Sequence, residues 1–283
     1  MPLAAASGDA HRGTANTMIK PFIRGLKATL HISHRGGAAL APENTLEAFR
    51  NAVDRYRTDM LELDVRLTRD GAVVVSHDAT TGRCCERDLQ IAATTLRDLQ
   101  HLDAGYRFTP DGGATFPFRG KGVYIPTLEE VFRACPGVKI NAELKAPMEG
   151  LVEQFVGVVR NERAVDRICC GSELDDVAYR LFKAMPEACH FYPREALTTF
   201  SLALKMGIDP TADNRFDVLN IPLYYQDERL VDAAFIEAVR GAGKWVNVWT
   251  VDDRDEMRKL VKDGVGGIMT DRPDVLREVL SGR

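Results

Sequence analysis

The sequence lacks the features that mark several large classes of protein. Only 7% of its 283 residues are aromatic, the formal net charge is −4, and no continuous apolar run approaches the length of a membrane span. A nucleic-acid-binding surface normally appears as a basic patch or stripe, and a transmembrane helix needs about 20 apolar residues. We therefore expect a small-molecule partner, no nucleic acid and no stable membrane insertion.

Cysteine is present without a metal or disulfide pattern. The six cysteines include adjacent pairs at 84–85 and 169–170, but there is no C-x-x-C motif and no spacing typical of a zinc site. This usage indicates buried, reduced thiols and a cytoplasmic protein.

The first 28 residues form an N-terminal segment without the basic start and apolar core of a secretory signal. The segment is rich in Ala, Ser, Gly and Thr, so we expect residues 1–17 to be disordered. The remaining residues, 29–283, are predicted to form a single domain.

Apolar, β-rich runs recur along the chain, and a helix-like stretch follows each of them. The eight predicted strands are residues 30–34, 60–67, 138–144, 167–171, 189–192, 217–222, 245–250 and 267–270. Helix starts are predicted where an acceptor precedes a carboxylate by three residues, or where proline fits a first helical position. They are Asn44 with Glu47, Thr127 with Glu130, Ser172 with Asp175, Asp253 with Glu256, and Pro273.

Eight successive strand–helix units predict an α/β fold, a (β/α)₈ TIM barrel of parallel strands. A doubly wound open sheet is the alternative, disfavoured by the count of eight and by the absence of a glycine-rich dinucleotide turn after the first strand. Residues 79–125 interrupt the alternation of predicted strands and helices, and they are rich in Gly, Pro and aromatic residues. We interpret them as an insertion over the barrel mouth, between strands two and three; a solvent-exposed elaboration is the alternative.

Two carboxylates occupy alternate positions of the second predicted strand. Glu62 and Asp64 share one face, while the leucine and valine residues between and after them share the other. If the apolar face meets the outer helices, the carboxylates point into the barrel, where a buried charge needs a compensating cation. Ion pairs with arginines such as Arg35 or Arg66 are the structural alternative.

A hairpin is expected to bring a histidine to these carboxylates. Asp70 and Gly71 separate two β-rich runs, which is a strong hairpin signal. If these two residues form the loop, the numbers of facing residues sum to 141, and Asp64 lies opposite His77 with Cβ atoms about 5 Å apart.

Further polar residues lie at the ends of the neighbouring predicted strands. Glu143 and Lys145 end the third strand, and His34 and Arg35 end the first. Three carboxylates without a nearby cysteine make a hard oxygen site suited to Mg²⁺ or Ca²⁺.

This set of residue types is suited to breaking a phosphate ester. A divalent cation neutralises phosphoryl charge, Arg35 offers fork-shaped hydrogen bonds, and Lys145 adds a positive charge. Two histidines can act as general base and general acid: one takes the proton of the attacking oxygen, and the other protonates the leaving alkoxide.

Five segments in order resemble the glycerophosphodiester phosphodiesterase family. They are HRGGAALAPENTLEAF, ELDVRLTRDGAVVVSHD, NAELK, VNVWTVDD and GVGGIMTDRPD. The resemblance implies a (β/α)₈ barrel and metal-dependent hydrolysis of glycerophosphodiesters to an alcohol and sn-glycerol 3-phosphate. It also implies the following roles: His34 and His77 as the acid/base pair, Glu62, Asp64 and Glu143 as metal ligands, Arg35 and Lys145 at the phosphate, and Trp249 against the glycerol.

Several other polar residues are assigned structural roles. Asn44 is first a helix cap. As an alternative, Asn44 and Glu43 orient the site residues by contacting them without touching the substrate. Thr270 and Asp271 end the eighth strand, and Asp271 is interpreted as a cap of the last helix. The remaining histidines, His31, His101 and His190, are also taken as structural.

Two alternative functions remain at this point. A lysophospholipase D would need an apolar groove for an acyl chain, and the insertion offers aromatic residues that could line one or form its small core. These are Tyr106, Phe108, Phe116, Phe118 and Tyr124. A noncatalytic phosphate- or metal-binding barrel would need a missing catalytic group, and none is missing. The sequence sets no oligomeric state.

Overall fold

The computed structural model describes residues 20–26, 29–208, 210 and 214–282. The segment expected to be disordered, residues 1–17, lies outside the described residues. All eight predicted strands are present within two residues of their expected bounds. They are β1 (Leu30–Ser33), β2 (Met60–Leu67), β4 (Lys139–Leu144), β5 (Ile168–Gly171), β6 (Cys189–His190), β7 (Val218–Pro222), β10 (Trp245–Trp249) and β11 (Gly267–Thr270).

These strands form a nearly closed parallel barrel. Their order is β6-β5-β4-β2-β1-β11-β10-β7, and a parallel bridge between Phe191 and Val218 brings the first and last of them together. The order follows the chain around the barrel, as successive strand–helix units require. The TIM-like barrel is therefore confirmed, and the open-sheet alternative is wrong.

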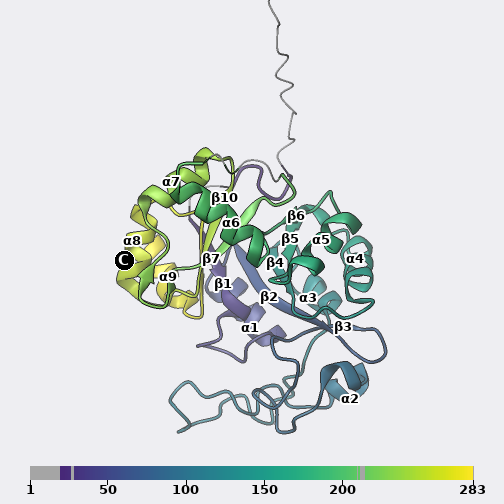
Figure 1. Ribbon diagram of the computed structural model, residues 1–283. Helices are drawn as coiled ribbons and strands as arrows, with labels where there is room; N and C mark the ends of the chain where they lie inside the picture. Colours follow the sequence, from purple (N-terminus) through teal and green to yellow (C-terminus); the bar gives the residue numbers. More distant parts are fainter. Residues whose placement is uncertain (1–19, 27–28, 209, 211–213, 283) are drawn as a thin grey trace, which may run out of the picture.

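Helices surround the barrel (Figure 1). In chain order they are α1 (Leu46–Arg50), α3 (Leu128–Ala134), α4 (Leu151–Asn161), α5 (Asp175–Ala184), α6 (Arg194–Lys205), α7 (Ala233–Gly241), α8 (Arg254–Lys262) and α9 (Pro273–Leu280). No helix in the described part of the chain is long and apolar enough to cross a membrane. All six cysteines are unpaired thiols, as their spacing predicted.

Three of the predicted helix starts are confirmed. Thr127 and Glu130 form a reciprocal capping box at α3, the Asp253 side chain accepts from two backbone amides at α8, and Pro273 opens α9. Each device satisfies or removes a backbone donor that a helix leaves unpaired at its start.

The two other helix starts were wrong. Thr45, not Asn44, caps α1, and Ser172 lies two residues before the cap position of α5. Ser172 instead donates from Oγ to the Leu144 carbonyl, and Asn44 adopts a left-handed φ of 58° with its side chain turned toward Asp64. In both cases a tertiary hydrogen bond outcompetes the local cap.

The β2 strand separates an apolar layer from a polar one, as its alternation predicts. Leu61, Leu63 and Val65 pack in the cluster between the sheet and the helices. Glu62 and Asp64 therefore point into the barrel, above a floor that includes Met60 and, from the described segment before β1, Phe22.

A series of hydrogen-bonded side-chain amides crosses the interior of the barrel and ends beside Glu62. The Trp245 indole donates to Asn247 Oδ1 (3.0 Å), Asn247 Nδ2 to Asn220 Oδ1 (3.0 Å), and Asn220 Nδ2 to Asn141 Oδ1 (3.1 Å). Because an indole can only donate, it sets the direction of all three amides. Asn141, the last amide of this hydrogen-bonded series, pairs in register with Glu62.

The predicted hairpin after β2 is present, but its register differs by one residue. β2 pairs with β3 (Val73–Val75) so that Val65 faces Val75, which gives a sum of 140 instead of 141. The loop is longer than two residues because Thr68 accepts from the Ala72 amide and Gly71 adopts a φ of 83°. The Asp64 backbone carbonyl therefore accepts a hydrogen bond from the Ser76 amide of the opposite strand, and His77 is the next residue after Ser76.

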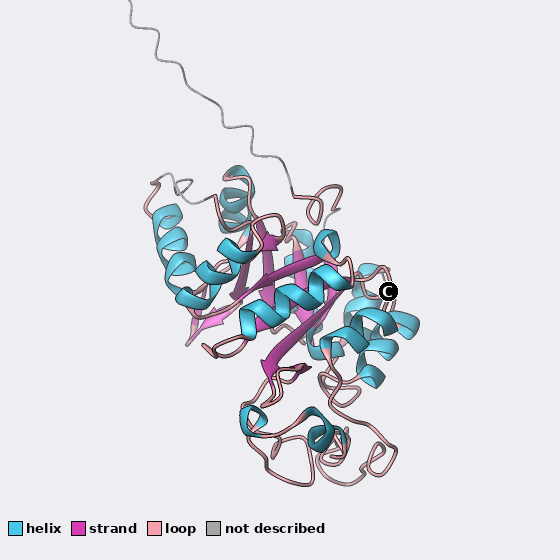
Figure 2. Cartoon of the chain, turned by 90° about the vertical axis from the view of Figure 1, so that its right-hand side faces the viewer, coloured by secondary structure: helices cyan, strands magenta, loops and turns pink. Residues whose placement is uncertain are grey.

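The residues between β3 and α3 form a loop-rich lobe beyond the carboxyl end of β2 (Figure 2). The lobe includes the short helix α2 (Leu96–Gln100) and packs around a small apolar cluster that contains Cys85, Leu99 and Val123. It contains the predicted insertion, residues 79–125. The insertion's bounds and the domain division at residue 29 remain predictions.

We expect Gly267→Ala to destabilise the barrel by about 1–3 kcal/mol, since overpacking a dense interior costs this much. A Cβ at this position would lie 2.6 Å from Ile32 Cδ1 and would collide with the Asn247 side chain. The matched control is Gly157→Ala in α4, where a Cβ meets nothing within 4 Å and where alanine should stabilise the helix by about 0.5–1 kcal/mol. Urea unfolding of both variants measures the two effects, and a shift of the same sign in both would contradict the packing argument.

We expect two buried histidines, which are neutral in the folded protein, to contribute a loss of stability as pH drops from 6.5 to about 4. Burial lowers the pKa of His31 and of His190 to about 4, from the ordinary histidine value of 6.5. In this window the unfolded chain binds more protons, so each histidine contributes a loss of at most about 1.4 kcal/mol per pH unit. Chemical denaturation should show that His190→Gln loses less stability than the native protein over this pH range. An equal change in the two proteins would contradict this prediction.

Candidate active site

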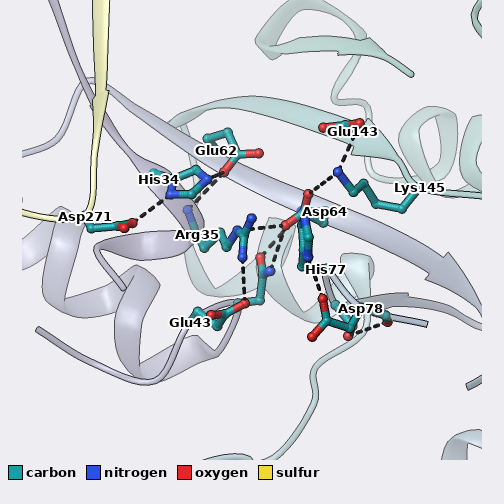
Figure 3. A network of polar contacts seen from close by, with 12 residues as sticks. His34, Arg35, Glu43, Glu62, Asp64, His77, Asp78, Glu143, Lys145 and Asp271 are labelled. Carbon is teal, nitrogen blue, oxygen red and sulfur yellow. Dashed lines mark hydrogen bonds and ion pairs between the residues drawn. The ribbon is translucent and has the colours of Figure 1, made fainter. Parts of the chain in front are cut away.

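The predicted site residues, Trp249 excepted, lie in one polar network at the mouth of the barrel, the end formed by the carboxyl ends of its strands (Figure 3). The network draws on the turn after β1, on the strands β2 and β4, and on the loops after β3 and β11. This is the end at which α/β barrels hold their active sites.

His34 lies in the tight turn after β1, between two carboxylates. Its Nδ1 is 2.7 Å from Asp271 Oδ1, and its Nε2 is 3.9 Å from Glu62 Oε2. Burial disfavours the charged imidazole, but Glu62 and Asp271 outweigh burial and raise the pKa of His34 above its usual value.

Sequence reasoning missed Asp271, which it assigned as a helix cap. Arg272 occupies the cap position of α9, and Asp271 instead holds His34. Asp252 accepts hydrogen bonds from the Asp271 amide and the Thr270 hydroxyl, which fixes this loop. The signal was the barrel itself: β11 pairs with β1, so the residues that follow the two strands are neighbours.

Asp64 is the most enclosed charge of the network, with 1% of its surface exposed. Its carboxylate lies 3.3 Å from Arg35 Nε and 3.6 Å from Lys145 Nζ, and it accepts a hydrogen bond from Asn44 Nδ2 at 3.0 Å. Lys145 Nζ also lies 3.2 Å from Glu143 Oε1. Glu143 is on β4 and pairs in register with Asp64 on β2. Asn44 thus supports a site carboxylate, and the buried charge is compensated from three sides.

Glu62 lies one step deeper in the barrel and accepts a hydrogen bond from the Arg35 amide at 3.0 Å. Burial and the neighbouring Asp64 raise its pKa to about 7, against the opposing influence of His34 and Arg35. Two carboxylates this close cannot both be charged cheaply without additional positive charge.

The glycine pair after Arg35 allows the turn to pack closely. Arg35 has a φ of 50°, and Gly36 and Gly37 have φ values of 85° and 92°. A Cβ at Gly36 would lie 2.7 Å from the Ala48 side chain, and one at Gly37 would lie 2.6 Å from Pro273 Cγ. The turn therefore needs glycine to lie against α1 and α9 while it presents His34 and Arg35 to the mouth.

His77 enters the site from the loop after β3. Its Nδ1 is 2.7 Å from Asp78 Oδ1, and its side chain is about a third exposed. Burial lowers the pKa of His77, and Arg35 and Lys145 act in the same direction, while Asp64 and Asp78 oppose them. Both imidazoles thus have a carboxylate at Nδ1, although the two pKa values shift in opposite directions.

The donor chemistry of the three carboxylates fits a hard divalent cation. Glu62, Asp64 and Glu143 come from one face of two adjacent strands, and all three offer carboxylate oxygens. Within the described ranges, no three His, Cys, Asp or Glu side chains are close enough to form a ready metal cage. Arg35 and Lys145 lie against the carboxylates instead, and the raised pKa of Glu62 reflects its burial beside a second carboxylate.

Trp249 lies apart from this network. It ends β10 with 42% of its surface exposed, and it pairs in register with Pro222 on β7. Its place at the end of a barrel strand puts it on the rim of the mouth.

A barrel whose mouth holds two imidazole–carboxylate pairs, clustered carboxylates and two cationic side chains has the groups that phosphoester hydrolysis needs. Comparison with known proteins agrees with this class. The model of the Glycerophosphoryl diester phosphodiesterase family matches residues 34–275. The chain belongs to this family and is a phosphoric diester hydrolase.

Individual relatives cover most of the chain. A glycerophosphodiester phosphodiesterase of Caldanaerobacter subterraneus is 31% identical over 88% of this chain and 96% of its own length. The lysophospholipase D GDPD1 of Rattus norvegicus is 26% identical over 89% of this chain and 86% of its own length. The crystal structure of a glycerophosphodiester phosphodiesterase from Agrobacterium tumefaciens superposes with a TM-score of 0.73 at 26% identity, covering 88% of this chain and 99% of that chain.

We expect Asp271→Asn to lower kcat by about 100-fold or more, because an amide neither holds the same imidazole tautomer nor stabilises its charged form. The control is Asp274→Asn, which removes a nearby carboxylate that pairs with Arg272 instead of a histidine. Diester hydrolysis and thermal unfolding of both variants check the prediction. Equal activity in the two variants would show that Asp271 does not act on His34.

Proposed function

We propose that this enzyme hydrolyses glycerophosphodiesters to an alcohol and sn-glycerol 3-phosphate by histidine acid/base catalysis with one divalent cation, Mg²⁺ or Ca²⁺. One observation carries the proposal. His34 and His77 each bond a carboxylate through Nδ1, and both lie beside the charged cluster centred on Asp64. The pairing leaves Nε2 of each ring to exchange a proton with the substrate.

The two imidazoles divide the proton transfers of the reaction. One accepts the proton of the attacking oxygen at Nε2, and the other donates a proton from Nε2 to the departing alkoxide. The alkoxide needs this proton because its conjugate acid has a high pKa. Asp271 and Asp78 hold the two rings by their other nitrogens, which keeps Nε2 directed at the substrate.

Glu62, Asp64 and Glu143 would hold the cation, and Arg35 and Lys145 would contact the phosphate. When bound, a divalent cation supplies charge neutralisation at the phosphoryl oxygens. Arg35 presents a planar fork to two of these oxygens, and Lys145 adds a point charge beside them. Trp249, at the rim, would pack against the glycerol.

Aromatic packing in the insertion supports water-soluble diesters over lysophospholipids. Phe108 and Phe118 stack edge to face with centroids 5.3 Å apart, and the Arg119 guanidinium lies over Tyr106 and Phe116. Four of the five aromatic residues thus pack against another ring or against Arg119, which favours a small core over a groove for an acyl chain. The 31% identity to a glycerophosphodiester phosphodiesterase points the same way.

Release of sn-glycerol 3-phosphate tests the proposal. We expect release from glycerophosphocholine and glycerophosphoethanolamine, with little from lysophosphatidylcholine. EDTA should abolish it, and Mg²⁺ or Ca²⁺ should restore it. Greater release from lysophosphatidylcholine would favour the lysophospholipase D alternative.

Substitutions separate the proposed proton transfer from cation binding. His34→Ala and His77→Ala should each abolish turnover but retain thermal stabilisation by added metal, whereas Glu62→Gln should lose both. Turnover retained in either histidine variant would contradict the role of that histidine. Metal stabilisation retained in Glu62→Gln would remove Glu62 from the cation site.

A further inference from the structure

Arg83, on the insertion, is the most heavily engaged cation near the site that the proposed mechanism does not use. Its side chain is 47% exposed, yet all three guanidinium nitrogens bond carboxylates. Nε donates to Asp78 Oδ2 at 2.5 Å, while the two terminal nitrogens donate to the two oxygens of Glu43 at 2.6 and 2.7 Å. This paired geometry is the strong, directional form of an arginine–carboxylate contact.

Each of the two carboxylates reaches a proposed site residue on its other side. Asp78 bonds His77 Nδ1 through Oδ1 at 2.7 Å. Glu43 accepts a hydrogen bond from Arg35 Nη1 through Oε1 at 3.1 Å. One guanidinium therefore lies at the centre of a continuous chain of hydrogen bonds that runs from His77 to Arg35.

The charges of this chain alternate, and Arg83 maintains the alternation. Burial alone would raise the pKa of Glu43 and of Asp78, but Arg83, together with Arg35 at Glu43 and His77 at Asp78, lowers both, that of Asp78 to about 2. Both carboxylates are thereby kept charged. Among the described residues, the Asp78 carboxylate forms hydrogen bonds with the side chains of His77 and Arg83.

The insertion fixes the position of Arg83. The amides of Cys84 and Cys85 both donate to the Thr81 carbonyl, which closes a tight turn around residue 83. Cys85 is fully buried in the apolar cluster of the lobe, and the Thr81 hydroxyl bonds the Arg87 carbonyl. Arg83 is thus anchored by packing outside the barrel while its side chain reaches back to the barrel mouth.

We propose that Arg83 is a positioning residue that orients His77 through Asp78 and Arg35 through Glu43. The inference rests on the proposed function, because it assumes that His77 and Arg35 act on the substrate. In this arrangement the insertion contributes no reacting group and sets the geometry of two of them. Outer partners of this kind commonly change activity by about 10- to 100-fold.

The first test replaces the guanidinium. Arg83→Met keeps the length of the side chain and should lower kcat/KM by about 10- to 100-fold. Arg83→Lys keeps the charge but cannot bond both carboxylates in the same way, so it should recover only part of the loss. Arg119→Met, in the same lobe but packed on Tyr106 and Phe116, is the matched control and should keep the native kinetics.

Double-mutant cycles test the route of the effect. Asp78→Asn should share its loss of kcat with Arg83→Met, so that the double variant is no slower than the worse single variant. Glu43→Gln should share with Arg83→Met a rise in KM, since Arg35 is the proposed phosphate contact. A purely structural role predicts multiplicative losses, or a smaller active fraction with native kcat and KM.

The outcomes separate this inference from the proposed function. Native kinetics in both Arg83 variants, or independent losses in both cycles, would overturn the positioning role. If Arg83→Met does not fold, the Arg83→Lys variant and its cycles with Asp78→Asn and Glu43→Gln decide the question. His77→Ala is assayed in parallel: if it keeps turnover, the proposed mechanism fails, whereas an inactive His77→Ala beside fully active Arg83 variants rejects only the positioning role.

Discussion

Glu62 and Asp64 lie two residues apart on one face of β2, and they are 5% and 1% exposed. Burying two like charges in a barrel is costly unless cations and hydrogen-bond donors surround them, and the rest of the mouth is arranged to meet this need. Arg35 and Lys145 supply positive charge, and Asn44 and the Arg35 amide supply donors. Burial and the neighbouring Asp64 nevertheless raise the pKa of Glu62. A site with unmet negative charge is suited to a divalent cation, which is the basis of the proposed chemistry.

Closure of the barrel decides which groups can act together. His34 and Asp271 are 237 residues apart in the chain, and they meet because β11 pairs with β1. The floor of the barrel contributes indirectly: the donor-only indole of Trp245 sets the direction of three amides, the last of them beside Glu62. Glu62 thus lies beside a series of amides whose hydrogen bonds have a fixed direction.

The lobe and the barrel meet at the proposed site. His77 and Asp78 leave β3 at the start of the lobe, and Arg83 returns from it to the turn after β1. Because the lobe has its own apolar cluster, its packing can place these groups without changing the barrel. This separation lets one part of the chain supply stability and another part adjust the reacting groups, which is typical of enzymes built on rigid barrels.

The sequence by itself determined the eight strands, the inward direction of Glu62 and Asp64, and the capping box at Thr127, because periodicity and capping depend on residues close in the chain. Motif resemblance added the family and the set of site residues. Only the tertiary structure decided the one-residue shift of the hairpin, the turn of Asn44 from helix cap to Asp64 partner, and the hydrogen bonds of Asp271 with His34 and of Arg83 with Asp78. Each of these depends on hydrogen bonds between segments far apart in the chain, whose strength depends on geometry that forms only when the barrel closes and the lobe packs.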